Sequence, residues 1–188
     1  MTRDYASLQR KPFLTPIWLT VLAAAAAMAL LAFSAWMWAT ADSTTVIVIR
    51  HAEQETDAGS DPPLSAAGRA RASRLGRLFG DFGSPGHLDA IYVAPTIRDR
   101  MTAVPLAGRL GLTPVDHVGG SAVLARRALH EHPGGRVLVI GHADTVKEIV
   151  EALSGATHLS SIAPDDYGTL YVVSVPRIGR ANVLRMNY

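Results

Sequence analysis

Two arginines and two histidines stand in this sequence at positions where they could do chemistry. Arg50 and His51 directly follow the apolar run Val46–Ile49, and Arg98 and His142 follow two further apolar runs. A guanidinium group is a planar fork that donates two parallel hydrogen bonds, so it suits a phosphate or a carboxylate. A histidine among cations has its protonated form disfavoured, and its neutral ring can act as a nucleophile. These residue types predict a pocket for a phosphoryl group.

Three predicted strands would position these side chains. We expect strands at Thr45–Ile49, Ala90–Val93 and Arg136–Ile140, because each is a short apolar run bounded by turn or polar residues. Strands alternate with helices along the chain, so the predicted fold class is α/β, with three α/β/α layers and a mostly parallel sheet. In such sheets ligands bind beyond the carboxyl ends of the strands. All four residues follow such an end.

The other predicted elements complete this sheet and its covering helices. Caps, glycines and apolar spacing predict helices at Ser65–Phe79, Thr96–Leu110, Ser121–His132 and Thr145–Leu153. A short strand is expected at Thr113–Asp116. Two alternating segments, Thr169–Val175 and Ala181–Met186, follow one another directly, which predicts an antiparallel pair at the C-terminal end of the sheet.

The N-terminal region contains a long apolar segment without any charged residue, from Pro12 to Ala41. About 20 such residues suffice for a helix to cross a bilayer. Arg3, Arg10 and Lys11 precede the segment, and this bias keeps the N-terminus in the cytoplasm and sends the rest across the membrane. The sequence therefore predicts a cytoplasmic tail over residues 1–12, a transmembrane signal-anchor helix over 13–41 and an extracytoplasmic domain, periplasmic or outer, over 42–188.

Two other interpretations of this segment stay open. Ala39-Thr40-Ala41 is a cleavage-site pattern, and cleavage before Asp42 would release the domain as a secreted protein. Against this, the apolar region is longer than the 7–15 residues that are typical of a signal peptide. The other interpretation is a hydrophobic helix packed within a cytosolic protein.

Charge and cysteine content exclude several classes of protein. Residues 1–41 hold three cations and one anion and so carry the whole net charge of +2, while the rest has 15 residues of each sign. A neutral domain gives no support to nucleic-acid binding, so no nucleic-acid partner is expected. The chain has no cysteine, which excludes disulfides and thiol chemistry.

Four blocks of the sequence resemble the histidine phosphatase (phosphoglycerate mutase-like) superfamily, branch 1, in the family's order. They are VIVIRHAE, PLSAAGRARASRLGRLF, IYVAPTIRDRMTAVPLAGRLGL and VLVIGHADTVKEIV, and the resemblance extends over about residues 45–188. It implies a phosphoglycerate mutase-like fold and a metal-independent phosphatase without a cofactor. The substrate would be a phosphorylated small molecule or a phosphoprotein.

The resemblance also implies roles for the four residues. His51 would be the nucleophile that takes the phosphoryl group as a phosphohistidine. Arg50, Arg98 and His142 would complete the catalytic site, where they bind the phosphate oxygens of the substrate and stabilise the charge of an in-line transfer. Phosphomonoesters, phosphohistidine and phosphoanhydrides are the substrate classes that this chemistry covers.

The sequence departs from the family pattern in the region of the general acid. Mutase-type members have a glutamate after the third strand, where this chain reads LTPVDHVGG. The candidates for the acid are Asp116, Glu53 and Asp144, with Asp57 as a further alternative. Ala94 and Met101 also replace a serine and a glutamine that are usual around Arg98. A degraded site that only binds phosphate, or a mutase-type phosphotransferase, are therefore the alternatives to a phosphatase.

Overall fold

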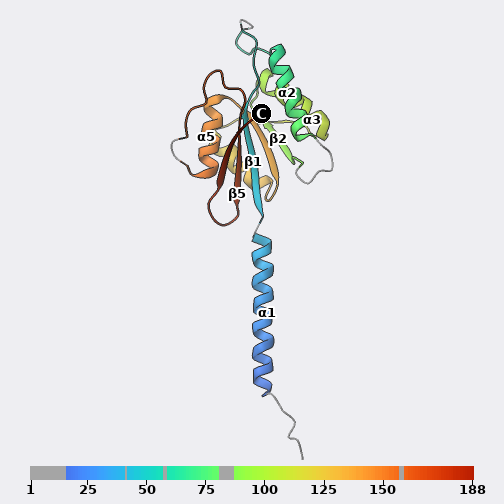
Figure 1. The fold of residues 1–188 in the computed structure, drawn as a ribbon, viewed down its shortest axis with the longest axis vertical. Coiled ribbons are helices and arrows are strands. Elements are labelled where there is room, and N and C mark those ends of the chain that lie inside the picture. The colour runs from blue at the N-terminus through green and yellow to red at the C-terminus, as the bar shows by residue number, and fades with distance from the viewer. Residues whose placement is uncertain (1–15, 41, 57–58, 81–86, 157–158) are drawn as a thin grey trace, which may run out of the picture. The chain divides into compact units, whose positions relative to one another are not determined.

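The computed structural model describes residues 16–40, 42–56, 59–80, 87–156 and 159–188. The chain divides into two compact units, one that ends at Thr40 and one that runs on to Tyr188. The first unit contains helix α1 (Ile17–Thr40), drawn in blue in Figure 1. Its segment Ile17–Trp38 has a mean hydropathy of 2.2 and is long and apolar enough to cross a membrane. Helix α1 is compatible with a membrane anchor or a signal sequence; the predicted tail over residues 1–12 lies outside the described residues.

The second unit contains one mixed sheet. Its strands are β1 (Ser43–Arg50), β2 (Ala90–Val93), β3 (Val115–Asp116), β4 (Arg136–Gly141), β5 (Thr169–Pro176) and β6 (Asn182–Asn187). The order is β3-β2-β4-β1-β5-β6, with parallel pairing from β3 to β1 and antiparallel pairing of β5 with both β1 and β6. The predicted parallel sheet with an antiparallel C-terminal pair is confirmed.

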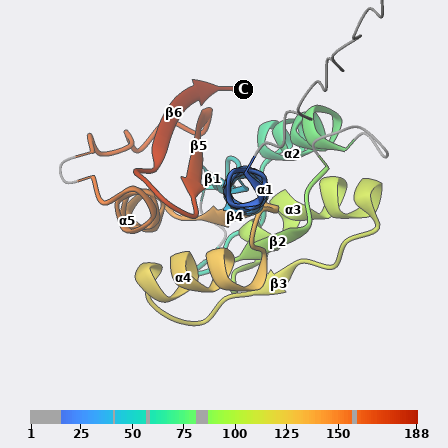
Figure 2. The same ribbon diagram turned by 90° about the horizontal axis from the view of Figure 1, so that it is seen from below.

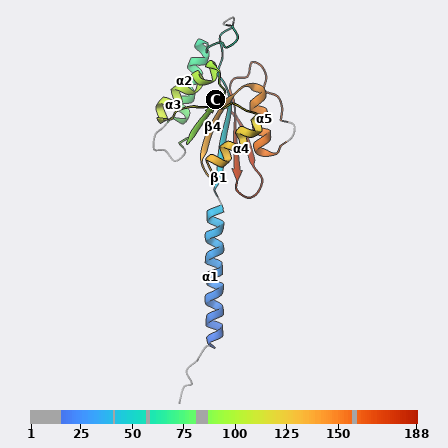
Figure 3. The same cartoon turned by 180° about the vertical axis from the view of Figure 1, so that it is seen from behind.

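Four helices cover the two faces of this sheet. They are α2 (Ala66–Phe79), α3 (Ile97–Leu110), α4 (Ser121–Glu131) and α5 (Ala143–Ser154). Helices α2 and α3 lie on one face and α4 and α5 on the other, as Figures 2 and 3 show from two directions. The three-layer α/β/α prediction is therefore confirmed.

Strand β1 is the centre of the core. Val46 and Val48 pack into the cluster under α4 and α5, whereas Ile47 and Ile49 pack into the cluster under α2 and α3. Successive side chains of a strand point to opposite faces, so a strand covered on both faces must be apolar at every position. Burial of each of these side chains is worth about 1.5–3 kcal/mol. This explains the unbroken apolar run before Arg50.

Capping residues set the ends of the helices that carry the site. Ser65 precedes α2 and its hydroxyl accepts a hydrogen bond from the Gly68 amide at 3.1 Å, and Thr96 caps α3 in the same way. Helix α3 ends at Gly111, which has a φ of 65° and so adopts the left-handed conformation that glycine permits. Both N-caps agree with the predicted helix starts.

Most predicted elements differ from the structure by one or two residues at an end, as at α5, β3 and α4. Helix α5 begins at Ala143, two residues before its predicted start, because His142 is its N-cap residue. The strand that was predicted at Thr113–Asp116 pairs only at Val115 and Asp116. Helix α4 ends at Glu131, one residue early.

Candidate active site

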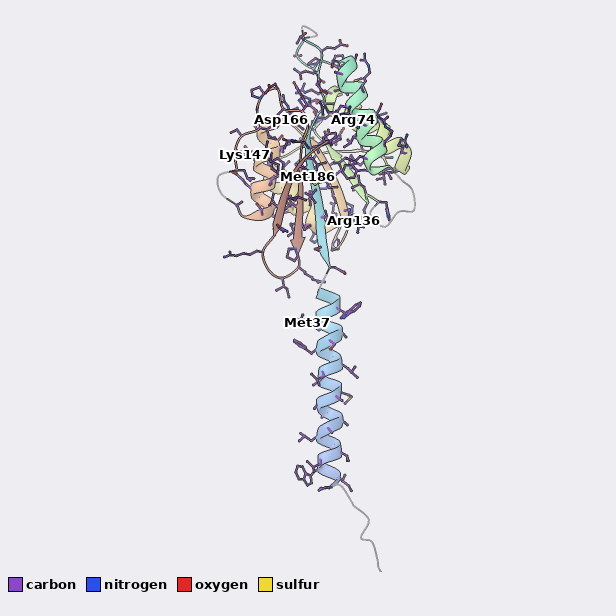
Figure 4. The ribbon with its side chains drawn as sticks, in the orientation of Figure 1. Met37, Arg74, Arg136, Lys147, Asp166 and Met186 are labelled. Carbon is purple, nitrogen blue, oxygen red and sulfur yellow. The ribbon has the colours of Figure 1, made fainter. Side chains whose placement is uncertain are left out.

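The strand order brings the three predicted strand ends together. Strands β2, β4 and β1 are neighbours in the sheet, so their parallel carboxyl ends form one continuous edge. This is the edge opposite Arg136, which begins β4 and is labelled in Figure 4. The rings of His51 and His142 lie 5.5 Å apart between centroids, and Arg98 Nη2 lies 2.8 Å from His142 Nε2.

His51 is held in one tautomer by its main-chain neighbour. Its side chain is buried, and Nδ1 lies 2.8 Å from the carbonyl oxygen of Ala52. A carbonyl oxygen only accepts hydrogen bonds, so Nδ1 carries the proton and Nε2 keeps a free lone pair. The His51 amide donates to the carbonyl of Gly141 at 2.9 Å, which ties it to the end of β4. This geometry leaves Nε2 as the unprotonated nitrogen of the ring.

Burial and charge both favour the neutral form of His51. Its pKa is lowered from the usual value of 6.5, chiefly because burial disfavours the imidazolium, and the guanidinium groups of Arg98 and Arg50 lower it further. The hydrogen bond to Ala52 and the charge of Asp99 oppose this shift without overcoming it. The ring is thus neutral at physiological pH, as a nucleophile must be.

Arg50 is fixed by the loop before β5. Its Nη1 donates to the carbonyl of Pro164 at 2.7 Å, and its guanidinium carbon lies 4.1 Å from the centroid of the Tyr167 ring. Asp166, labelled in Figure 4, belongs to the same loop and offers its own carbonyl to Arg50 at 3.4 Å. Arg50 Nε is buried and has no hydrogen-bond partner within the described part of the chain. That donor is unpaired.

Arg98 is the second residue of α3 and contacts groups on both sides. Its Nη1 lies 3.4 Å from Asp61 Oδ1 and its Nη2 donates to His142 Nε2. Because arginine only donates, His142 Nε2 must accept and is unprotonated in this arrangement. Among the described residues nothing pairs with the buried Nε of Arg98. This guanidinium also retains an unused donor.

His142 is oriented by the start of α5, and its ring lies close to a buried carboxylate. Its amide donates to the Thr145 hydroxyl at 2.8 Å, and that hydroxyl donates to the His142 carbonyl at 2.9 Å. Nε2 also lies 3.3 Å from Asp99 Oδ2. Asp99 is fully buried and its Oδ2 accepts from the Thr96 hydroxyl. The second histidine is therefore held by two helices.

Each of the three candidate acids has hydrogen-bond partners of its own. Glu53 accepts two parallel hydrogen bonds from Arg71, Asp116 is bonded to Arg100 at 2.9 Å, and Asp144 accepts from the Thr145 amide at 2.8 Å. In the described ranges none of the three bonds to Arg50, His51, Arg98 or His142. Asp57, the further alternative, lies outside the described residues.

The sequence analysis missed several residues at the site. Besides Tyr167 and Asp99, these include Asp61 and Thr102. Asp61 accepts from the Ile97 amide at 3.0 Å and lies next to Arg98, so it joins the loop after β1 to the start of α3. Thr102 accepts from the Ala52 amide at 3.0 Å and donates to the Arg98 carbonyl at 2.8 Å. Asp61 carries no local signal, since it stands in a polar loop. Thr102 lies one turn after Arg98, and this spacing could have marked it.

The substitutions near Arg98 do not disturb this framework. Met101 packs against a small apolar cluster that includes Ala52 and Leu64, and the Ala94 carbonyl accepts from the Thr96 amide at 2.8 Å. No group of three or more His, Cys, Asp or Glu side chains that could hold a metal ion occurs in the described ranges. Taken together, the site is a neutral imidazole among cationic donors, which suits an anionic phosphoryl group.

Comparison with known proteins agrees with this architecture. Residues 46–119 match the model of the histidine phosphatase superfamily (branch 1), a region that includes Arg50, His51 and Arg98. No curated protein matches the chain by sequence. The family match and the shared fold make this domain similar to members of branch 1 of the histidine phosphatase superfamily.

Solved structures share the fold at low sequence identity. One is the protein histidine phosphatase SixA complexed with tungstate, with 21% identity and a TM-score of 0.62, covering 76% of this chain and 96% of that one. Another is a mycobacterial glucosyl-3-phosphoglycerate phosphatase, with 15% identity and a TM-score of 0.62, covering 77% and 99%. A third, described as mycobacterial hydrolase 1, has 15% identity and a TM-score of 0.55, covering 75% and 96%. These similarities establish a phosphoglycerate mutase-like fold.

Proposed function

We propose that this protein is a phosphatase that works through a covalent phosphohistidine on His51. The single observation that carries the proposal is the state of His51, which is buried and neutral, with Nδ1 bonded to the Ala52 carbonyl. This leaves Nε2 as a nucleophile beside the donors of Arg50 and Arg98. Solved relatives of the same fold are described as a protein histidine phosphatase and a glucosyl-3-phosphoglycerate phosphatase, which supports phosphorylated substrates.

The reaction has two transfers. The lone pair of His51 Nε2 attacks phosphorus, and the bond from phosphorus to the leaving atom breaks, an oxygen in an ester or anhydride and a nitrogen in a phosphohistidine substrate. The leaving atom keeps the electron pair and takes a proton from water. Water then attacks the phosphohistidine, the N–P bond breaks, and its electrons return to Nε2 with release of inorganic phosphate. The cationic donors of Arg50 and Arg98 stabilise the equatorial oxygens in both steps.

The leaving group limits which substrates react quickly. A positioned proton donor typically contributes 10²–10⁴-fold to such a step. Since Glu53, Asp116 and Asp144 are bonded elsewhere, phosphohistidine, phosphoanhydrides and esters of acidic alcohols are the best substrates. Their leaving groups need less protonation than those of alkyl esters.

The decisive experiment is turnover and trapping with the full chain in lipid nanodiscs. We expect hydrolysis of a generic aryl phosphate, and a ³²P label on the protein after quenching in alkaline denaturant, where phosphohistidine is stable. His51→Ala should abolish both signals. His130→Ala is the matched control, because His130 is exposed at the end of α4.

The alternative function is a site that binds phosphate without hydrolysing a phosphate ester. The same experiment, extended with tungstate binding, distinguishes this alternative from a phosphatase. Tungstate is a tetrahedral oxyanion, and the SixA relative was solved in complex with it. Tight tungstate binding together with equal aryl phosphatase rates for the wild type and His51→Ala would mean a phosphate-binding module. Inhibition of His51-dependent turnover by tungstate would support the enzyme.

The location of the domain follows from the same proposal. Helix α1 would be an uncleaved signal-anchor, with residues 42–188 on the extracytoplasmic face. Arg3, Arg10 and Lys11 before the apolar segment support this orientation. A topology reporter fused after Tyr188 should be active outside the cytoplasm. Reporter activity in the cytoplasm would contradict the predicted export of the domain. A shortened protein that begins at Asp42 would mean that the N-terminal segment is a cleaved signal peptide.

A further inference from the structure

A pocket of about 220 Å³ lies beside the proposed active site. Ala94 and Pro95, which follow β2, line it together with Gly141, the last residue of β4, and Thr145 of α5. Gly141 accepts the hydrogen bond from the His51 amide, and Thr145 exchanges two hydrogen bonds with the main chain of His142. The pocket and the site therefore share walls, although His51 itself does not line the pocket.

The other walls of the pocket are apolar. Val118, Leu124 and Ile149 contribute hydrophobic side chains, and none of the eleven lining residues is Asp, Glu, Lys or Arg. An apolar cavity of about 150 Å³ is large enough for a benzene ring. This pocket has the size and lining for one ring or a short branched chain. A polyhydroxylated group would lose hydrogen bonds to water against these walls without replacing them.

One of the lining residues, His117, carries a polar atom without a partner. His117 follows β3, and its amide donates to the Val93 carbonyl at 2.9 Å. Its Nε2 is buried and has no hydrogen-bond partner in the described part of the chain. The ring passes close to Gly119, where a β-carbon would come within 3.3 Å of its Cε1. A buried nitrogen left unpaired costs free energy, which a ligand group bonded to it would recover.

We infer that this pocket receives the organic part of the substrate, a small apolar group with one hydrogen-bonding atom that meets His117 Nε2. The inference rests on the proposed phosphatase function and names its substrate class. In an in-line transfer the leaving group stands on the far side of phosphorus from the nucleophile. A pocket that adjoins the site without being lined by His51 suits that position. Phosphate esters of phenol-like alcohols fit it, and phosphosugars do not.

Phosphonates test the pocket without any turnover, because their P–C bond is not hydrolysed. Calorimetric titration of the full chain in lipid nanodiscs would compare methylphosphonate, phenylphosphonate and the three hydroxyphenylphosphonate isomers. We expect phenylphosphonate to bind at least tenfold more tightly than methylphosphonate. The best hydroxyphenyl isomer should gain threefold or more over phenylphosphonate.

Two variants address different walls of the pocket. Ser121 lines it at the start of α4, and Ser121→Leu should fill it and reduce the phenyl preference to about one. His117→Leu should keep the phenyl preference and remove the gain of the hydroxyl group. His130→Leu, at an exposed histidine of α4, should change neither ratio.

The outcomes separate this inference from the proposed function. Equal affinities for methylphosphonate and phenylphosphonate, or a phenyl preference that Ser121→Leu leaves intact, would overturn the inference while the phosphate site stands. If methylphosphonate and tungstate both fail to bind, the phosphate site and the inference fall together. A hydroxyl gain that survives His117→Leu would remove His117 from the recognition.

Discussion

Arginines occur around the active site in two different states. On one side, which we call the paired side, Arg71 of α2 forms an ion pair with Glu53. Its Nε and Nη2 donate hydrogen bonds to the Glu53 carboxylate at 2.6–3.0 Å, and its Nη1 donates to the main-chain oxygen of Tyr188 at 3.2 Å. On the open side, formed by Arg50 and Arg98, each guanidinium has a buried Nε without a partner among the described residues. The Asp61 contact of Arg98 is long, at 3.4 Å.

The difference separates structural cations from candidate ligand-binding ones. A bidentate arginine–carboxylate pair satisfies both partners and leaves few donors for a third group. An arginine with buried unpaired N–H groups is costly until an anion arrives. Glu53, one of the candidates for the general acid, is paired with Arg71 in this arrangement.

The largest expected effect comes from removing a cation of the open side. Arg98→Ala should lower kcat/KM for an aryl phosphate about 10²–10³-fold, because a donor to the transferring phosphoryl group is lost. Arg100→Ala is the matched control on the same helix, since Arg100 is exposed and pairs with Asp116. Steady-state kinetics of both variants measure the contrast. Equal losses would mean that α3 as a whole, and not Arg98, supports the activity.

The second effect concerns how closely the paired side is packed. A β-carbon at Gly68 would lie 2.1 Å from the Glu53 carbonyl oxygen, so Gly68→Ala must push α2 away from the segment after His51. We expect a loss of about 1–3 kcal/mol in the free energy of unfolding. Gly108→Ala has open space around its β-carbon and should stabilise α3 by about 0.5–1 kcal/mol. Denaturant titration of both variants measures these changes in the free energy of unfolding. A Gly68→Ala variant as stable as the wild type would contradict the close packing of α2 on Glu53.

A smaller effect is expected from neutralising the carboxylate of the paired side. The hydrogen bonds from Arg71 lower the pKa of Glu53 below its usual 4.5, so Glu53 stabilises the fold above the unfolded pKa and loses this contribution as pH falls through the folded pKa. Glu53→Gln should cost about 1–2 kcal/mol at pH 7. The gap between the two unfolding curves should narrow as pH falls below 4.5. A gap that is independent of pH below 4.5 would assign the cost to packing.

The smallest expected effect is a displaced acid limb in the pH–rate profile. Since burial lowers the pKa of His51 below 6.5, and only the neutral ring attacks, kcat/KM should begin to fall at a pH below 6.5. The same shift makes folding less favourable as pH falls below 6.5, because the unfolded chain then binds more protons. Arg50→Gln should move the limb toward higher pH, since it removes a charge that opposes protonation. A limb that stays in place would exclude this cation as a cause.

Much of the fold could be predicted because the signals are local. The apolar run before Arg50 predicts a doubly buried strand, and Ser65 and Thr96 predict the helix starts that the structure has. That Arg50, Arg98 and His142 gather at one edge also followed from placing each after a strand in a parallel sheet. The predicted α/β class needed no long-range information.

What could not be predicted depends on contacts distant in sequence. Glu53 follows His51 by two residues, yet its carboxylate pairs with Arg71, which lies eighteen positions further on. The strand order that makes β2, β4 and β1 neighbours has no local signature either. Asp61 shares an apparently featureless loop with other polar residues, and only the approach of α3 gives it a partner.

The central position of β1 has a mechanical consequence. The chain enters the domain at Ser43 and reaches the active site at Arg50, and eight residues of strand separate these ends by about 26 Å. Over that length β1 is laddered to β4 through six residue pairs and to β5 through seven. A pulling force applied to the domain at Asp42 would act along β1. It would shear the hydrogen bonds of β1 with β4 and with β5 before it reached His51. A force applied at this end of the domain would thus be spread over thirteen pairs, and the geometry around the nucleophile would be shielded from it.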